Sequence, residues 1–179
     1  MISKHSPLTV FRFCPKCGKQ DFVPDSEKSL KCISCGFRYF INMNAAVAAI
    51  IRNDKNEVLF TVRKHEPASG LLDLPGGFVD LGETAEDAIV REVFEELNLI
   101  ITDTTFWGSY TNKYVYCEIE YQTLDLVFNC LVETFQNIQA ADDVSGFVFR
   151  DPLTVKHEEI GLKSIREIVK DIRRKMENC

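Results

Sequence analysis

The sequence predicts an α/β domain with a mixed sheet, preceded by a small zinc-binding module. Three observations predict it: two Cys-x-x-Cys-Gly motifs near the N-terminus, strand-like segments on both sides of an acidic helical segment, and an amphipathic helical pattern near the C-terminus. The 179 residues, 45% of them hydrophobic, can form one ordinary core and a small additional module. We therefore expect a module in residues 1–42 and the main domain in residues 43–179.

Four cysteines predict the N-terminal module. They form two Cys-x-x-Cys-Gly motifs separated by 14 residues, at Cys14, Cys17, Cys32 and Cys35. This spacing is typical of a zinc ribbon, because thiolates from two tight turns complete the tetrahedral coordination of Zn²⁺. Such a closed site is structural and contributes folding free energy to a small module. Two redox-active dithiols or disulfides are the alternative interpretation.

Charge is distributed unevenly along the chain, whose formal net charge is −6. Residues 1–42 carry seven Lys and Arg against three acidic residues, a local charge of +4, and the other residues carry −10. This difference supports a boundary near residue 42. The acidic main domain is not expected to grip a long nucleic-acid backbone, which requires a continuous basic surface. Nucleic acid is therefore not the expected partner, and the basic ribbon is the only part of the chain through which it could bind.

The N-terminal segment and the apolar runs bear on localisation. Residues 1–13 are polar and lack the apolar stretch of a secretion signal, and the longest purely apolar run, residues 45–51, is too short to span a bilayer. We therefore expect a cytoplasmic protein with no membrane partner, and a homodimer stays open. The other cysteines are expected as two core residues, Cys117 and Cys130, and a tail thiol, Cys179.

The main domain is expected to begin with two strands. Residues 45–52 are small and β-branched, as in a buried strand, and residues 58–63 form a second strand-like segment. Between them, residues 53–56 have the composition of a turn. The pattern predicts a β-hairpin.

A helix is expected after the next loop. Residues 64–73 are loop-like, and the Pro-Gly-Gly sequence at residues 75–77 permits backbone conformations that larger residues resist. The helix is expected to begin after Thr84, because Asp87 three residues later resembles a capping box with a shorter acid. It is expected to end at Asn98.

The C-terminal half continues the alternation of strands and helices. Aromatic and β-branched residues predict strands at residues 106–116 and 121–133, and a short strand at residues 147–150. Apolar residues recur at helical spacing across residues 158–177, which predicts a terminal amphipathic helix.

The acidic helix places three carboxylates together. At 100° per residue, Glu92, Glu95 and Glu96 lie within an arc of about 100°, and the apolar residues of the helix occupy another arc. A bound cation would relieve the repulsion of these glutamates, and their hard oxygen atoms suit Mg²⁺ or Mn²⁺. An ordinary solvated face of the helix is the alternative.

The segment GFVDLGETAEDAIVREVFEELNL, residues 77–99, bears on this choice. It resembles the Nudix box, G-x5-E-x7-R-E-U-x-E-E-x-G-U, in which U is aliphatic. Eight of the nine specified positions match, at Gly77, Glu83, Arg91, Glu92, Val93, Glu95, Glu96 and Leu99. Asn98 stands where the pattern has glycine, and Asn tolerates a left-handed cap conformation. The resemblance implies the α/β/α sandwich of the Nudix family.

The resemblance also implies roles for the charged residues of the motif. Glu92, Glu95 and Glu96 would bind Mg²⁺ or Mn²⁺, and one of them would activate water. Arg91 and Glu83 would orient these ligands, as ionic partners of metal ligands do. An exposed acid near a helix start is the alternative interpretation of Glu83.

Three further residues are implied to contact the substrate. Gly76 and Gly77 could offer backbone groups to metal or phosphate, or could simply form a turn. Arg63 resembles a phosphate-contacting position of the family, and its guanidinium suits that task. A surface salt bridge is the alternative for Arg63.

A zinc ribbon before a Nudix domain resembles the NADH pyrophosphatase branch of the family. Members of that branch carry an S-Q-P-W-P-F-P-x-S array beyond the box, and residues 106–114 lack its three prolines and its glutamine. Selectivity for NADH is therefore not implied. Four aromatic residues in and just after this segment could stack on a nucleobase or could be core and cross-strand pairs: Trp107, Tyr110, Tyr114 and Tyr116.

Three functions remain possible from the sequence. The first is hydrolysis of a nucleoside diphosphate linked to another moiety, such as ADP-ribose or a dinucleotide such as NADH, with water attacking one phosphorus. The second is action on RNA 5′ ends, helped by the basic ribbon. The third is a non-catalytic regulator in which the ribbon recognises nucleic acid or a partner and the main domain only senses a nucleotide. The complete glutamate set disfavours this function.

Overall fold

The computed structural model describes residues 3–177, which divide into two compact units. The first unit comprises the described residues up to 43 together with residues 113–122. The second comprises residues 44–112 and the described residues from 123 onward. No helix within residues 3–177 has both the length and the apolar character needed to cross a membrane.

The first unit contains a short helix and a three-stranded antiparallel sheet of order β1-β2-β3. Its elements are α1 (Pro7–Val10), β1 (Phe22–Ser26), β2 (Ser29–Cys32) and β3 (Arg38–Phe40). Its core has five buried residues, namely Leu8, Cys14, Phe22, Leu30 and Cys32. So small a core supplies little apolar burial, which fits a module that depends on a metal for its stability.

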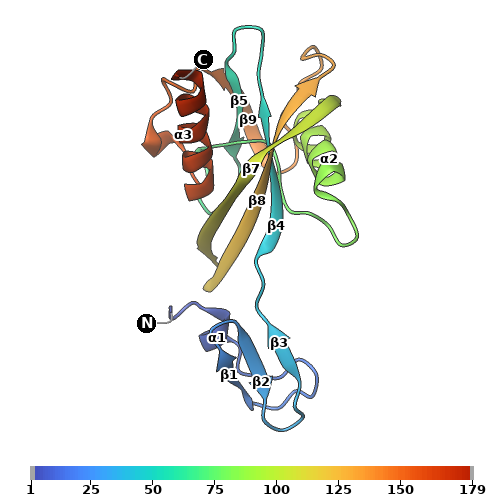
Figure 1. Ribbon diagram of the computed structural model, residues 1–179, viewed down its shortest axis with the longest axis vertical. Helices are drawn as coiled ribbons and strands as arrows, with labels where there is room; N and C mark the ends of the chain where they lie inside the picture. Colours follow the sequence, from blue (N-terminus) through green and yellow to red (C-terminus); the bar gives the residue numbers. More distant parts are fainter. Residues whose placement is uncertain (1–2, 178–179) are drawn as a thin grey trace. The chain divides into compact units, whose positions relative to one another are not determined.

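The second unit contains two three-stranded sheets between two helices (Figure 1). One sheet has the order β4-β8-β7, from β4 (Asn44–Ile51), β7 (Ile101–Tyr116) and β8 (Ile119–Val132). The other has the order β6-β5-β9, from β5 (Val58–Arg63), β6 (Leu72–Asp73) and β9 (Val144–Arg150). Strand β4 pairs with β8 in parallel, whereas β5 pairs antiparallel with β6 and β9. The predicted α/β architecture with mixed strand directions is confirmed.

The hairpin predicted for β4 and β5 is wrong. These strands belong to different sheets, and an isolated bridge between Arg52 and Val58 joins the segments at the connecting turn. β4 pairs over its whole length with β8, from Asn44 opposite Thr123 to Ile51 opposite Cys130. The residue composition identified the strands correctly, but the partner of β4 lies far along the sequence.

Both faces of β4 are buried, which explains its continuous run of small apolar residues. Ala48 and Ile50 belong to the core on the side of helix α3 (Lys163–Glu177). Val47, Ala49 and Ile51 belong to the core on the side of helix α2 (Ala85–Leu97). The sheet therefore separates two cores, each closed by one helix.

The two helices differ in how closely they follow the prediction. Helix α2 begins after Thr84, as predicted, and its last residue is Leu97, with Asn98, the predicted end, as the C-cap in the left-handed conformation with φ of 53°. Helix α3 begins at Lys163 rather than near residue 158, because the 3₁₀ turn η1 (His157–Glu159) precedes it.

One predicted core cysteine is in fact exposed. Cys130 is 3% exposed, as expected of a core residue, but Cys117 is exposed in the turn between β7 and β8. Cys117 and Glu118 both have positive φ values, 46° and 63°, as in a two-residue hairpin turn. The predicted tail thiol Cys179 lies outside the described residues.

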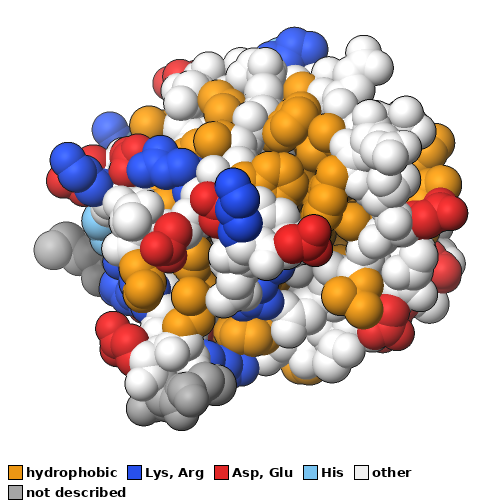
Figure 2. Space-filling model, turned by 90° about the horizontal axis from the view of Figure 1, so that it is seen from above, with side chains coloured by type: hydrophobic (Ala, Val, Ile, Leu, Met, Phe, Trp, Pro, Cys, Tyr) orange, Lys and Arg blue, Asp and Glu red, His pale blue; other side chains and the backbone are white. Residues whose placement is uncertain are grey.

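On the face seen in Figure 2, acidic, basic and apolar side chains are interspersed. Such a mixed face differs from the continuous basic surface that a nucleic-acid backbone requires.

Candidate functional site

Helix α2 places the acidic side chains of the site, and local capping fixes where it begins. The Thr84 hydroxyl accepts a hydrogen bond from the Asp87 N–H at 3.1 Å and donates one to the Asp87 carboxylate at 2.7 Å. Asp87 therefore closes the first turn through the side chain of Thr84, a variation on the predicted capping box. With the start fixed, the register of Glu92, Glu95 and Glu96 on the helix follows.

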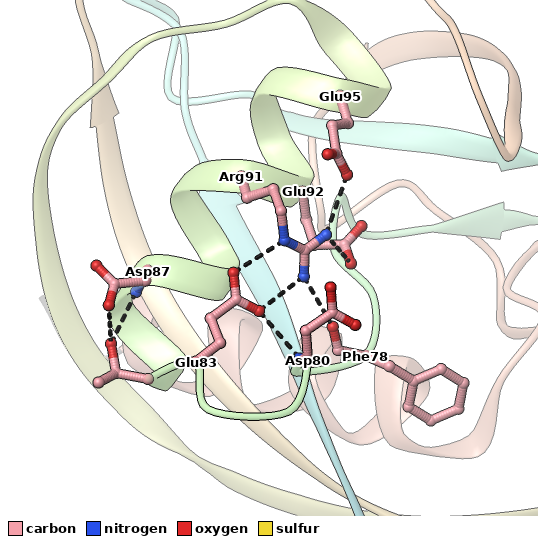
Figure 3. A network of polar contacts seen from close by, with 8 residues as sticks. Phe78, Asp80, Glu83, Asp87, Arg91, Glu92 and Glu95 are labelled. Carbon is pink, nitrogen blue, oxygen red and sulfur yellow. Dashed lines mark hydrogen bonds and ion pairs between the residues drawn. The ribbon is translucent and has the colours of Figure 1, made fainter.

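Arg91 joins three of the predicted acids in one network (Figure 3). Its Nε and Nη2 atoms donate to the two oxygen atoms of Glu83, both at 2.9 Å. Its Nη1 atom donates to Glu92 at 2.9 Å and to Glu95 at 3.0 Å. Nη2 also donates to the Phe78 carbonyl at 3.1 Å, which ties the preceding loop to the helix. All five N–H donors of Arg91 are therefore used, and these bonds hold the guanidinium in one orientation.

The network changes the acidity of its members. Hydrogen bonds from Arg91 are the main cause that lowers the pKa of Glu83 to about 2, and the Asp80 N–H contributes. The same contacts, first that with Glu83, raise the pKa of Arg91 above its ordinary value. Glu83 therefore stays ionised as a fixed partner of Arg91, which supports a positioning role over that of a simple exposed acid.

Glu96 is held separately from this network. Glu96 is buried, with 6% of the residue exposed, and its carboxylate accepts a hydrogen bond from the Gly76 N–H at 3.0 Å. Burial is the main cause that raises the pKa of Glu96 to about 8. Burial likewise raises the pKa of Glu92. A nearby divalent cation would reverse this effect, because it stabilises the ionised form.

The two glycines allow the loop to approach its neighbours closely. The Gly77 carbonyl accepts from the Val47 N–H at 2.8 Å, so the loop lies along β4. A Cβ atom on Gly76, whose φ is 145°, would lie 2.1 Å from the Val47 carbonyl oxygen. A Cβ atom on Gly77 would lie 2.5 Å from the Glu92 carboxylate. Gly76 therefore requires glycine because backbone atoms of β4 would block a Cβ atom, whereas a Cβ atom at Gly77 would displace the Glu92 carboxylate.

Arg63 has a partner of its own. Its Nη1 atom contacts the Asp73 carboxylate at 2.5 Å, and its Nε atom donates to the Pro67 carbonyl at 2.7 Å. Burial raises the pKa of Asp73, and the charge of Arg63 opposes that rise. These contacts resemble the structural alternative for Arg63, and its contact with a phosphate stays a prediction.

Three acidic residues near the glutamates escaped the sequence analysis. Burial is the largest cause of the raised pKa of Glu96, and the charges of Asp73, Glu92 and Asp143 raise it further. For Glu92 too, burial is the largest cause, and the charge of Asp142 adds to the rise in its pKa. Asp142 and Asp143 end a loop that bonds to the end of α2 through the Ala141 N–H and the Glu96 carbonyl, at 2.9 Å. Nothing local in the sequence predicts this approach, since the loop follows β8.

The four predicted metal-binding cysteines come together in the first unit. Their sulfur atoms all lie within 4.8 Å of one another, and two pairs, Cys14 with Cys35 and Cys17 with Cys32, are 3.7 Å apart. A tetrahedron of thiolates at the usual Zn–S length has edges of about 3.8 Å, so the cluster fits Zn²⁺.

Two equivalent turns build this cluster. Gly18, with φ of 72°, donates to the Cys14 carbonyl at 2.8 Å, and Gly36, with φ of 74°, donates to the Cys32 carbonyl at 2.9 Å. Burial alone would raise the pKa of Cys14, but the backbone N–H groups of the first turn lower it to about 7. The first turn therefore favours a thiolate at Cys14, the form that binds metal, whereas burial and the three neighbouring cysteines raise the pKa of Cys17 to about 12.

The four aromatic residues of the segment after the box make structural contacts. Trp107 packs against the α3 core with the Lys175 ammonium 3.5 Å from its ring centre, and the Tyr110 hydroxyl donates to Asp171 of α3 at 2.7 Å. In the first unit, Tyr114 and Tyr116 both contact the ring of Tyr121, at centroid distances of 5.9 and 6.5 Å. These contacts favour the core and cross-strand interpretation.

Together, the sandwich and the Arg91 network define a class: an α/β/α domain whose helix presents carboxylates beside a glycine loop. The model of the NUDIX domain matches residues 43–172, and the chain belongs to the Nudix family. The fold agrees with a crystal structure of a NUDIX hydrolase from Nitrosomonas europaea. That structure has a TM-score of 0.67 at 20% identity, and the match covers 94% of this chain and 93% of the other.

Curated relatives add sequence similarity over shorter segments. The chain is 32% identical over 103 residues to the NAD-capped RNA hydrolase NudC of Haemophilus influenzae (strain PittEE), a match that covers 57% of this chain and 39% of that protein. It is 42% identical over 76 residues to the ADP-ribose pyrophosphatase of Methanocaldococcus jannaschii, covering 42% of this chain and 44% of the relative. The matches thus span less than half of each relative's length.

Proposed function

We propose that this protein is a divalent-metal-dependent pyrophosphohydrolase that cleaves a nucleoside diphosphate linked to another moiety, with ADP-ribose or a dinucleotide as substrate. The observation that carries the proposal is the intact acid set of α2, with Arg91 bonded to Glu83, Glu92 and Glu95 and with Glu96 held by Gly76. A protein that only sensed a nucleotide would have no need of this arrangement.

The donor set of the site fits a hard divalent cation. Glu92, Glu95 and Glu96 would hold Mg²⁺ or Mn²⁺, since carboxylate oxygens suit these ions and two of the glutamates are buried enough to disfavour their uncompensated charge. The bound ion would neutralise charge that develops on the diphosphate. When the ion binds, Glu92 and Glu95 would give up part of their hydrogen bonding to Arg91 and coordinate the ion instead. Glu83 would keep the Arg91 guanidinium in place.

The side chains would divide the remaining work between them. One of the three glutamates would accept the proton of the attacking water, whose oxygen forms the new bond to phosphorus as the bridging P–O bond breaks. Gly76 and Gly77 would keep the loop close enough to offer backbone groups to the diphosphate. Arg63 would contact a phosphate oxygen only if it gives up part of its ion pair with Asp73.

The names of two relatives support the substrate class. The similar archaeal protein is an ADP-ribose pyrophosphatase, and the similar bacterial protein is an NAD-capped RNA hydrolase. Both names describe an adenosine diphosphate joined to a second group. We extend that chemistry to this chain as a proposal.

The direct test is a substrate panel with purified protein and magnesium. We expect ADP-ribose to give AMP and ribose 5-phosphate, and NADH or NAD to give AMP and the corresponding mononucleotide, identified by chromatography. Hydrolysis of none of these compounds, with either magnesium or manganese, would contradict the proposal.

A second candidate function is removal of an NAD cap from RNA, which the NudC relative favours. The basic ribbon, residues 1–42, would then contact the RNA chain. Cleavage of a short NAD-capped RNA should in that case exceed cleavage of free NAD, and the difference should shrink as salt rises. Equal rates at all salt concentrations would favour the small-molecule function.

We further propose that residues 1–42 form a zinc ribbon whose four cysteines hold one structural Zn²⁺, and that residues 43–179 form the hydrolase domain. The cysteine geometry and the match of the domain model from residue 43 support this division.

A further inference from the structure

A buried acid outside the glutamate network has no role in the reaction proposed above. Asp125 of β8 is 6% exposed, and its Oδ1 atom accepts a hydrogen bond from the Thr123 hydroxyl at 2.5 Å. Within residues 3–177, no basic side chain forms an ion pair with it. A buried carboxylate with one hydroxyl partner has acceptor capacity left over.

Strand pairing places Asp125 in a row that runs across the sheet. Ala46 of β4 pairs with Asp125 on one side and forms a bridge with Phe78 on the other. Paired residues of neighbouring strands share a face of the sheet, so these three side chains lie on one face. It is the α3 face, because Ala48 and Val127, the next such pair along these strands, belong to the α3 core.

The hairpin turn extends this pattern to β7. The two-residue turn at Cys117 and Glu118 sets Tyr116 opposite Ile119, so counting back along both strands places Asn112 opposite Thr123. The stacked rings of Tyr114 and Tyr121, at the intermediate position, agree with this count. Asn112 therefore lies beside Thr123 on the face that carries Asp125.

Asn112 is the second polar side chain on this face with unused hydrogen-bonding capacity. The residue is 4% exposed, its side-chain amide forms no hydrogen bond within residues 3–177, and its amide atoms are not among the fully buried atoms without a partner. The amide therefore has unused donors and an unused acceptor that a ligand can reach. Its position beside the Thr123–Asp125 pair indicates where that ligand binds.

Phe78 supplies an apolar surface at the other end of the row. It is 47% exposed, and its ring points away from the guanidinium that binds its carbonyl (Figure 3). Ala46, between Phe78 and Asp125, carries only a methyl group. A planar ring could therefore lie over Ala46 with one face toward Phe78 and one edge toward Asp125.

This row is close to the glutamates. Beyond the effects of burial and of its own hydrogen-bonding partners, the charge of Asp125 raises the pKa of Asp73. The charge of Asp73 in turn raises the pKa of Glu96, after the larger effect of burial. Asp73 is therefore near both groups, and the Phe78 backbone is bonded to Arg91. A single nucleotide could reach from the glutamates to Asp125.

We propose that Asp125 and Asn112, with Phe78 beside them, bind the adenine ring of the substrate and determine specificity for the base. The inference rests on the function proposed above and names the part of that site that selects the nucleotide. The free oxygen of Asp125 accepts a hydrogen bond from the exocyclic amino group. The Asn112 amide donates to an adjacent ring nitrogen, and the Phe78 ring stacks on the base.

The chemistry distinguishes adenine from hypoxanthine, in which an oxygen replaces the amino group. That oxygen would face the carboxylate of Asp125, so two hydrogen-bond acceptors would lie opposite each other and no hydrogen bond could form between them. In Asp125→Asn the amide can donate to this oxygen, while its carbonyl still accepts from Thr123. The substitution should therefore change which base is preferred, beyond any general loss of activity.

The experiment measures kcat/KM for ADP-ribose and for its inosine analogue with magnesium. We expect the unaltered protein to favour ADP-ribose by at least ~10-fold, as the loss of one hydrogen bond to a charged group implies. Asp125→Asn should abolish or reverse this ratio, and Asn112→Ala should lower kcat/KM for ADP-ribose ~10-fold. The matched control is Asp54→Asn, in the exposed turn after β4, which should leave both constants unchanged.

The outcomes separate this inference from the proposed function. Hydrolysis of both compounds at equal efficiency, or an unchanged ratio in Asp125→Asn, would overturn base recognition and leave the hydrolase function standing. Hydrolysis of neither compound by the unaltered protein would overturn both. If Asp125→Asn fails to fold by circular dichroism, Asn112→Ala decides, and unaltered efficiency in that variant contradicts the inference.

Discussion

Glu96 is the residue whose chemistry depends most on the fold around it. In the sequence it is one of three similar glutamates, but the structure buries it and gives it the Gly76 N–H as a partner, whereas Glu95 bonds to Arg91 near solvent. The side-chain positions of Arg91 and Glu83 follow from the motif. The proximity of Asp73, Asp142 and Asp143 could not be predicted, because tertiary contacts of distant loops create it.

The raised pKa of Glu96 predicts how stability depends on pH without magnesium. The folded protein keeps this proton up to pH about 8, whereas the unfolded chain releases it near the ordinary value of 4.5. The contribution to stability is therefore complete below pH 4.5 and is lost as the pH rises through about 8. With no magnesium added, the melting temperature of the unaltered protein should fall relative to that of Glu96→Gln as the pH rises from 5.5 to 8, so that the two values approach each other or cross.

Magnesium should act in the opposite direction. Because it binds the ionised carboxylate, it should raise the melting temperature more at pH 8 than at pH 5.5, and Glu96→Gln should reduce that difference. A magnesium effect that is equal at both pH values in the unaltered protein would count against Glu96 as a ligand.

At the scale of elements, local signals predicted more than pairing did. Both ends of α2 follow from Thr84 and Asn98, whose capping contacts lie within the same few residues. The strand segments were identified by composition, yet the expected hairpin of β4 with β5 was wrong, since β4 pairs with β8. Register across a sheet depends on partners that a local pattern does not reveal, and this is also why Asp125 and Phe78 escaped notice.

The ribbon is the element whose prediction is most easily tested. We expect one tightly bound zinc per chain in the purified protein, measured by elemental analysis. Cys14→Ser or Cys32→Ser should lose the zinc and increase hydrogen exchange in residues 3–43, because the small core needs the metal. The control Cys117→Ser, at an exposed cysteine outside the cluster, should keep the zinc and show no increase in hydrogen exchange. Freshly purified protein without zinc would refute the ribbon.

At the scale of the whole molecule, two compact units share one chain, and the family model covers the larger one. The curated relatives match this chain over less than half of their own lengths. Their substrates therefore guide the choice of compounds to test, while the selectivity of this chain depends on its own residues. A homodimer stays a prediction.

Selectivity for the reduced nicotinamide is predicted to be weak. Residues 106–114 lack the proline-rich array of the NADH pyrophosphatase branch, and Trp107 and Tyr110 are engaged with α3. Because this segment has no groups matched to NADH, the protein should not prefer NADH over NAD or ADP-ribose. We expect similar kcat/KM values for NADH, NAD and ADP-ribose at one magnesium concentration. A hundredfold preference for NADH would show that this segment recognises it by other means.

The central claim is that the glutamates of α2 carry out metal-dependent hydrolysis, and one measurement tests it most directly. Release of AMP from ADP-ribose is followed across a magnesium titration for the unaltered protein, Glu95→Gln, Glu96→Gln and the control Glu86→Gln, an exposed acid in the first turn of the same helix. We predict that both ligand variants stay folded and lose about 10²-fold or more in turnover, while the control keeps full activity. Unchanged magnesium-dependent release of AMP in Glu95→Gln and Glu96→Gln would contradict the account.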